Sequence, residues 1–133
     1  MTEWNPRSTP SFTRREMTCR CGCGRADMDG NFMDFLQAVR ARTGPMHVNS
    51  GYRCPAHNAR VSATGANGPH TTGRAADIRC SGAFAHRLVR EAVILGATGI
   101  GVAQQGPHES RFVHIDTLTP AEATGCRPWI WSY

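Results

Sequence analysis

Two helical segments, each with a single apolar face, are set among short strand segments and constrain the fold most. The first helix is predicted from Asp29 to Arg42, where Asp27 or Asp29 can cap its start and Gly44-Pro45 stops it. The second is predicted to follow Ser81, which can cap it, and to end at Gly96. Each helix must cover its apolar face with another element. These faces consist of Met28, Phe32, Phe35, Leu36 and Val39 in the first, and Phe84, Leu88, Ala92 and Leu95 in the second.

The remaining periodic segments indicate short strands and one short helix. Strands are predicted at residues 46–49 and 73–79, and a short helix at 55–61, where Pro55 suits the first position. Residues 99–103 and 111–117 form a predicted β-hairpin. Because helices and antiparallel strands mix without βαβ regularity, the fold class is α+β, with an antiparallel sheet flanked by helices.

The length of 133 residues predicts a small single domain. Residues 1–18 are rich in Pro, Ser and Thr and are interpreted as an extended arm, which leaves residues 19–133 as the folded domain. The aromatic tail, residues 127–133, is expected to pack against the body. The first twenty residues lack an apolar signal-peptide core, and no run approaches the ~18 apolar residues of a membrane helix. We therefore expect no membrane insertion.

All 15 basic residues are Arg, and the net charge is +5. Such a charge favours anionic partners in general. The arginines are scattered, however, and no basic stripe is interleaved with aromatic residues. A small nucleic-acid binder is therefore disfavoured, and we expect no nucleic-acid partner.

Six cysteines, at positions 19, 21, 23, 54, 80 and 126, permit three interpretations. The string Cys19-Arg-Cys21-Gly-Cys23 could form half of a structural zinc site, although C-x-C-x-C departs from the usual C-x₂₋₄-C spacing. The even count also suits disulfides in an oxidising compartment. The third possibility is reduced thiols packed in the interior.

Two motifs could carry chemistry. The segment His70-x₆-Asp77 lies where a loop enters a strand, and Phe112-Val-His114-Ile-Asp116 forms a strand with His114 and Asp116 on one face. Two imidazoles and one carboxylate, from His70, Asp77 and His114, suit zinc and leave a fourth position open, as in catalytic sites. Histidines on half-buried strands also occur as ordinary hydrogen-bonded residues, so this pattern alone leaves both possibilities open.

The order of motifs resembles the zinc D-Ala-D-Ala carboxypeptidase family of peptidoglycan metallopeptidases, in its compact phage endolysin-type branch. The resemblance spans roughly residues 19–133. It rests on CRCGCG, Val48-Asn-Ser-Gly-Tyr-Arg53-Cys-Pro, Pro69-His70-x₂-Gly73-x-Ala-Ala-Asp77, Gly99-Ile-Gly, Phe112-Val-His114-Ile-Asp116 and a Trp-rich tail. It implies a hedgehog/DD-peptidase-like fold, with residues 19–133 as a zinc peptidase domain.

The resemblance also implies roles for individual residues. His70, Asp77 and His114 would ligate Zn²⁺, and Arg53 would hold a substrate carboxylate or polarise the scissile carbonyl. Ser50 is a further substrate-binding candidate that can support the turn. Many family members carry an acid three positions before the last histidine ligand, where this chain has Arg111. The general base must then come from elsewhere. Glu109 and Asp116 are the candidates, and Asp116 could instead orient His114.

These roles imply a zinc metallopeptidase, either a D,D- or L,D-carboxypeptidase or an endopeptidase, that cleaves a stem peptide or cross-link of bacterial peptidoglycan. We expect a monomeric phage or prophage endolysin. It would be made in the bacterial cytoplasm without a signal peptide, and would act in the periplasm or cell wall after release or from the virion. The alternative is a catalytically inert, zinc-stabilised cell-wall-binding module on the same fold.

Overall fold

Five short strands form one sheet in the order β1-β2-β4-β3-β5 in the computed structural model, which describes residues 1–133. β1–β2, β2–β4 and β3–β4 are antiparallel, as predicted, and β3–β5 is parallel. The strands are β1 (His47–Ser50), β2 (Ala75–Arg79), β3 (Gly99–Ala103), β4 (Phe112–Asp116) and β5 (Trp129–Ser132).

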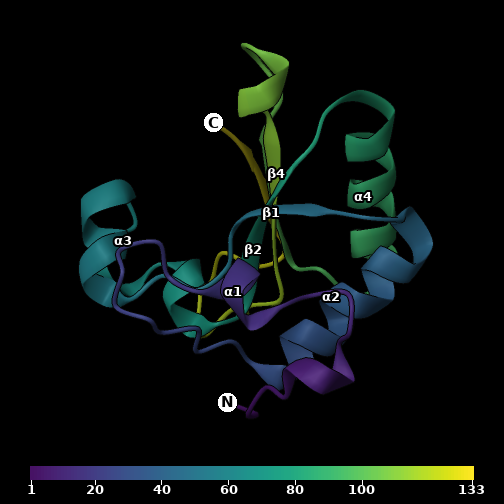
Figure 1. Ribbon diagram of the computed structural model, residues 1–133. Helices are drawn as coiled ribbons and strands as arrows, with labels where there is room; N and C mark the ends of the chain where they lie inside the picture. Colours follow the sequence, from purple (N-terminus) through teal and green to yellow (C-terminus); the bar gives the residue numbers. More distant parts are fainter.

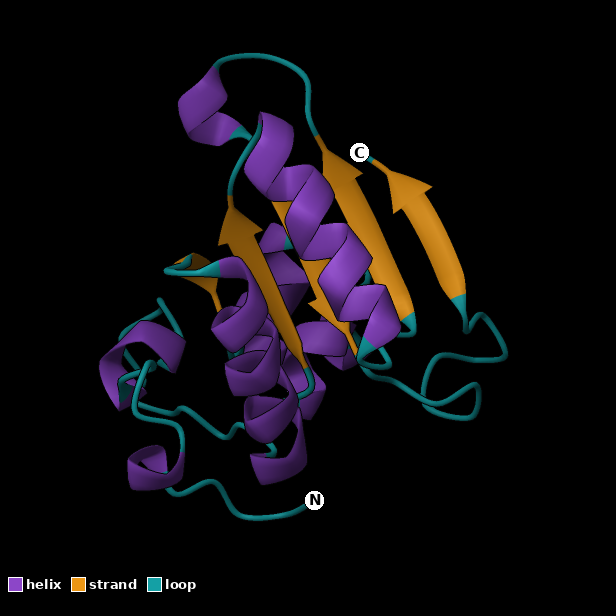
Figure 2. Cartoon of the chain, turned by 90° about the vertical axis from the view of Figure 1, so that its right-hand side faces the viewer, coloured by secondary structure: helices purple, strands orange, loops and turns teal.

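Helices lie on both sides of this sheet. The α-helices are α1 (Arg14–Met17), α2 (Gly30–Thr43), α3 (Pro55–Val61) and α4 (Gly82–Ile94), and the 3₁₀ turns are η1 (Pro6–Ser8), η2 (Gly65–Asn67), η3 (Pro69–Thr72) and η4 (His108–Ser110). Figure 1 shows α2 and α4 on one side of the central strands and α3 on the other, and Figure 2 shows α4 lying along the sheet. The predicted α+β class is confirmed. None of the helices combines the length and the hydrophobicity that crossing a bilayer requires.

The sheet has one apolar face and one polar face. Ile78, Val113 and Ile115 are fully buried in the core that α2 and α4 cover. Because successive strand residues point to opposite faces, Asp77, His114 and Asp116 lie on the other face. The β2–β4 register places Asp77 directly beside His114. The alternation predicted for Phe112–Asp116 therefore positions the polar groups of the site.

Two glycines in β3 make room for side chains on the polar face. Gly99 lies opposite Asp116, and Gly101 lies opposite His114. A Cβ at Gly99 would overlap the Asp116 carboxylate, and one at Gly101 would come within 2.7 Å of the Trp131 ring. A larger residue at position 99 would displace Asp116 itself, and one at position 101 would displace Trp131, whose ring packs against His114.

The N-terminal segment differs from the predicted extended arm. Residues 6–8 and 14–17 form single helical turns, and Thr13 and Glu16 form a capping box at the start of α1. Phe12 and Met17 are buried in the core. The segment thus folds onto the body through two apolar anchors, although its Pro, Ser and Thr content suggested otherwise.

Several local features can be compared with the expectations from the sequence. The tail packs on the body as expected, and does so as β5 at the sheet edge. Asp29 caps α2 by accepting a hydrogen bond from the Phe32 amide. Ser81 occupies the N-cap position of α4 but makes no capping bond, and its hydroxyl lies 3.2 Å from His108 Nδ1 instead. All six cysteines are free thiols, so the structure contains no disulfide.

Candidate metal centre

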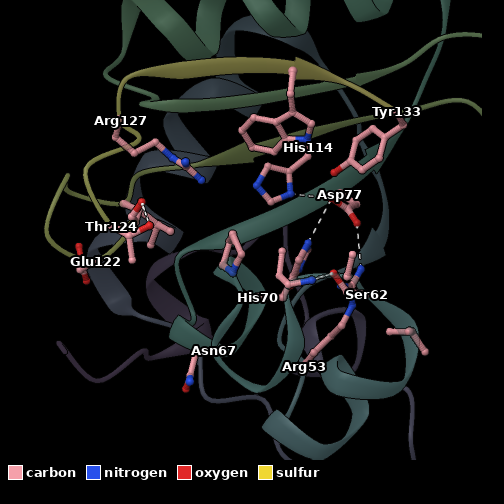
Figure 3. A pocket seen from close by; sticks show the side chains of 18 of the residues that line it. Arg53, Ser62, Asn67, His70, Asp77, His114, Glu122, Thr124, Arg127 and Tyr133 are labelled. Atoms are coloured by element: carbon pink, nitrogen blue, oxygen red, sulfur yellow. Dashed lines mark hydrogen bonds and ion pairs between the residues drawn. The ribbon is translucent and has the colours of Figure 1, made fainter.

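Three buried side chains converge on one point of the polar face. His70 comes from η3, Asp77 from β2 and His114 from β4, and their donor atoms all lie within 4.8 Å of one another. Asp77 Oδ1 is 3.2 Å from His70 Nε2 and 3.0 Å from His114 Nδ1. Figure 3 shows the three side chains pointing toward one another. The structure therefore brings together the residues that the two sequence motifs singled out.

The hydrogen bonds of both histidines leave the correct nitrogen free for a metal. His70 Nδ1 donates to the Gly51 carbonyl oxygen at 2.7 Å, which leaves the Nε2 lone pair facing Asp77. His114 Nε2 donates to Asp116 Oδ2 at 2.8 Å, which leaves Nδ1 facing the same point. Two imidazole nitrogens and a carboxylate oxygen form a known catalytic zinc donor set, so these residues fit Zn²⁺.

Electrostatics keep the two carboxylates ionised. Burial acts to raise the pKa of Asp77, but the positive charge and hydrogen bonds that His70 and His114 supply when protonated outweigh it and hold that pKa below its usual range. A bound cation would supply the same positive charge when the facing ring nitrogens are unprotonated. Burial likewise acts to raise the pKa of Asp116, yet hydrogen bonds from His114 and Arg127 lower it to about 2. Both groups are thus negatively charged at neutral pH, as a cation site requires.

Asp116 is saturated with hydrogen bonds. Arg127 binds it through two nitrogens, Nε to Oδ1 at 2.9 Å and Nη2 to Oδ2 at 2.7 Å. His114 and the Leu118 amide supply two more donors, and the carboxylate is completely buried. Asp116 was predicted as a general base or as a partner of His114. Its surroundings fit the second role, in which it fixes the ring orientation and the tautomer of His114.

The other predicted base, Glu109, is not brought to the site. It lies on η4, is exposed, and does not line the pocket that contains the histidines. Apart from Asp77, the acidic residue lining that pocket is Glu122, which sequence reasoning missed. Glu122 accepts hydrogen bonds from Arg74 and Thr119.

Arg53 lies beside the three donors, as predicted. Its Nη2 donates to Asp77 Oδ2 at 3.1 Å, its Nη1 to Asn58 Oδ1 at 3.0 Å, and its Nε to Ser50 Oγ at 3.1 Å. The guanidinium carries five N–H groups, so two remain available to a ligand in the pocket. Ser50 accepts a hydrogen bond from Arg53 Nε and does not line the pocket. This contact is consistent with the supporting role in the turn, and its contact with substrate stays a prediction.

The donors line a pocket of about 840 Å³. One wall is the segment 61–70, and the opposite wall comes from residues 118–133. Trp131 packs against His114 with ring centroids 5.1 Å apart, and Tyr133 also faces the cavity. The aromatic residues of the tail predicted that it packs against the body. Its position at the pocket depends on the β3–β5 pairing, which no local sequence pattern predicts.

Exchanging Asp116 for asparagine tests its role. Donors face both carboxylate oxygens, His114 Nε2 and Arg127 Nη2 at Oδ2 and Arg127 Nε and the Leu118 amide at Oδ1. An asparagine NH₂ group would oppose donors in either orientation, so we expect zinc affinity at the histidine site to fall about 10–100-fold. Competition with a chromophoric chelator measures this affinity. Glu109→Gln is the matched control and should change neither affinity nor kcat. A kcat loss with undiminished affinity in Asp116→Asn would instead identify Asp116 as the base.

Comparisons with known proteins agree with the site. The family model described as Peptidase M15 matches residues 10–116, which includes all three donors and Arg53. A comparison with curated proteins gave no match. Because the match covers most of the chain and places the donor set within it, this protein belongs to the Peptidase M15 family of zinc-dependent, D-Ala-D-Ala carboxypeptidase-like metallopeptidases.

Proposed function

We propose that this protein is a zinc peptidase that hydrolyses peptide bonds of bacterial peptidoglycan, in a stem peptide or a cross-link, and that it serves as a phage or prophage endolysin. The observation that carries the proposal is the convergence of His70 Nε2, Asp77 Oδ1 and His114 Nδ1 at a pocket. The family membership supports a peptidase, and the pocket supports a peptide-sized substrate.

His70, Asp77 and His114 would hold the zinc ion. When bound in such a site, zinc supplies Lewis-acid polarisation of a carbonyl group and activation of water. The chain's own contribution is to fix the donors in place. Gly51 orients His70, and Asp116 orients His114, while Arg127 holds Asp116 in turn.

Arg53 has two N–H groups left for the substrate. They can donate to the oxygen that becomes negative when the scissile carbonyl is attacked, or to a terminal carboxylate of the peptide. Hydrogen bonds to Ser50, Asn58 and Asp77 fix the Arg53 guanidinium before substrate arrives. The guanidinium therefore loses little conformational freedom when substrate binds. Arg53 is therefore the residue that we propose to contact the reacting group or the peptide terminus.

The pocket offers donors to the carboxylates of a peptide. Arg53 and Arg127 line it together with Asp77 and Glu122. Each arginine is paired with an aspartate, so a bound zinc ion and the two free N–H groups of Arg53 would attract the anionic group. Trp131 and Tyr133 add aromatic surface beside the donors. Peptidoglycan stem peptides carry free carboxylates, which arginines bind bidentately. We propose that the enzyme meets this substrate in the cell wall or periplasm, after release from the cytoplasm or from a virion.

One observation favours a second candidate, an inert zinc-stabilised module that binds the cell wall. Arg111 occupies the position where many relatives are expected to have an acid. Neither Asp116 nor Glu109 presents a free carboxylate to the pocket. A module of this kind would keep the metal centre and the pocket but would cleave nothing.

Digestion of purified peptidoglycan separates the two candidates. The peptidase should clear the suspension and release fragments whose new termini, read by mass spectrometry, identify the bond. A chelator should abolish clearing and added zinc should restore it. Binding to the walls without clearing, under zinc-replete conditions, would favour the module and contradict the proposed hydrolysis.

A further inference from the structure

Four of the six cysteines form a second cluster away from the pocket. Cys19, Cys21 and Cys23 come from one loop, and Cys54 comes from the residue before α3, 31 positions further along the chain than Cys23. Their sulfur atoms all lie within 4.8 Å of one another. Cys19 and Cys54 are buried, whereas Cys23 is exposed. Two segments distant in sequence thus present four thiols to one point.

The spacing of the sulfur atoms fits a metal and not a disulfide. Cys19 Sγ lies 3.5 Å from Cys21 Sγ, and Cys21 Sγ lies 3.7 Å from Cys54 Sγ. A disulfide would bring two sulfurs to about 2.05 Å. Four thiolates around a tetrahedral zinc, each with a Zn–S distance of about 2.3 Å, lie about 3.8 Å apart. The observed separations are close to this tetrahedral edge.

The local backbone also suits bound thiolates. The Cys54 amide donates to Cys19 Sγ at 3.4 Å, a contact that stabilises negative charge on sulfur. Gly22 adopts a φ of +92°, which lets the chain turn between Cys21 and Cys23, and Gly24, directly after Cys23, has a φ of +78°. Arg20, in the same loop, donates only to backbone carbonyl oxygens and can offset part of the net negative charge of a four-thiolate zinc complex, whereas Arg25 is paired with Asp27.

The cysteine cluster lies beside the turn of residues 50–54, which contributes Arg53 to the pocket. Cys54 directly follows Arg53, whose backbone amide donates to the His70 carbonyl oxygen. The neighbouring Tyr52 amide donates to the Met17 carbonyl oxygen, which joins the same turn to α1. A metal that linked residues 19–23 to Cys54 would lock residues 50–54 between the N-terminal segment and the histidine site.

We propose that Cys19, Cys21, Cys23 and Cys54 bind a second zinc ion with a structural role. The site would be closed, because four protein ligands leave no coordination position for water or substrate. This site does not depend on the proposed hydrolytic activity. It makes the C-x-C-x-C segment and Cys54 one functional unit, which the sequence spacing did not reveal.

Metal analysis of protein purified under reducing conditions tests the proposal. We expect two zinc ions per chain in the wild type, one in His70→Ala, one in the Cys21→Ser/Cys23→Ser double variant, and two in the control Cys126→Ser, whose cysteine lies outside the cluster. X-ray absorption of the single zinc in His70→Ala should show sulfur ligands only.

Each outcome decides the proposal. If the double serine variant fails to fold, the absorption spectrum of His70→Ala still reports on an intact cluster. A zinc-free His70→Ala protein with four titratable thiols at these positions would overturn the structural site. Iron bound in place of zinc would also overturn it. A protein mass lower by two hydrogen atoms, which indicates a disulfide among the four cysteines, would do the same.

Discussion

His70→Ala is expected to lower kcat/KM for peptidoglycan peptides by at least about 10³-fold, which corresponds to ~4 kcal/mol of transition-state stabilisation. The reason is the loss of one of only three protein donors at the pocket. His70 is buried and its ring is oriented by Gly51, so no neighbouring side chain can replace its Nε2. Steady-state hydrolysis and zinc content of the purified variant measure the effect.

His86→Ala is the matched control, because His86 is exposed on α4 and lies outside the donor cluster. It should retain wild-type hydrolysis and zinc content. Substantial activity in a His70→Ala protein that has lost the corresponding zinc would show that hydrolysis does not use this centre.

Arg53→Lys is expected to lower kcat/KM by about 100-fold at saturating zinc, the loss typical of removing one oxyanion donor. Lysine keeps the charge but cannot bind Ser50, Asn58 and Asp77 at once while still offering N–H groups to a ligand. The split between kcat and KM separates the two roles: a lost carbonyl donor lowers kcat, whereas a lost carboxylate contact that is equal in ground and transition states raises KM.

Arg60→Lys is the control for this change, since Arg60 is exposed on α3 and does not line the pocket. It should leave both kinetic constants unchanged. An Arg53→Lys enzyme with unaltered kcat and KM would exclude Arg53 from contact with substrate and confine it to holding Asp77.

The parts of the fold that follow local rules could be predicted from the sequence. Helical periodicity located α2 and α4 to within one or two residues at most ends. Strand alternation put Val113 and Ile115 on the face opposite His114 and Asp116, and the structure buries the first two in the core. The donor set His70, Asp77 and His114 was suggested by residue type and by the family resemblance. The β2–β4 register that places Asp77 beside His114 is known only from the structure.

The remaining features depend on contacts between distant segments. Arg127 reaches Asp116 because β5 pairs in parallel with β3 at the sheet edge. Asp116, predicted as a candidate base, is therefore a buried hydrogen-bond partner of His114 and Arg127. Glu109 lies on a hairpin loop whose direction no local pattern determines. The four-cysteine cluster could not be predicted from local patterns either. Cys54 joins it because the turn of residues 50–54 packs against residues 17–25 in the folded chain.

We expect His70, Asp77 and His114 to bind one zinc ion at the pocket. Anomalous X-ray diffraction at the zinc absorption edge, from crystals grown with zinc, locates that ion. The expected peak is bound by His70 through Nε2, by Asp77 through a carboxylate oxygen, and by His114 through Nδ1, because Asp116 holds the other nitrogen of that ring. A map with no peak among these three side chains, or with zinc bound at the pocket by other residues, would contradict this expectation.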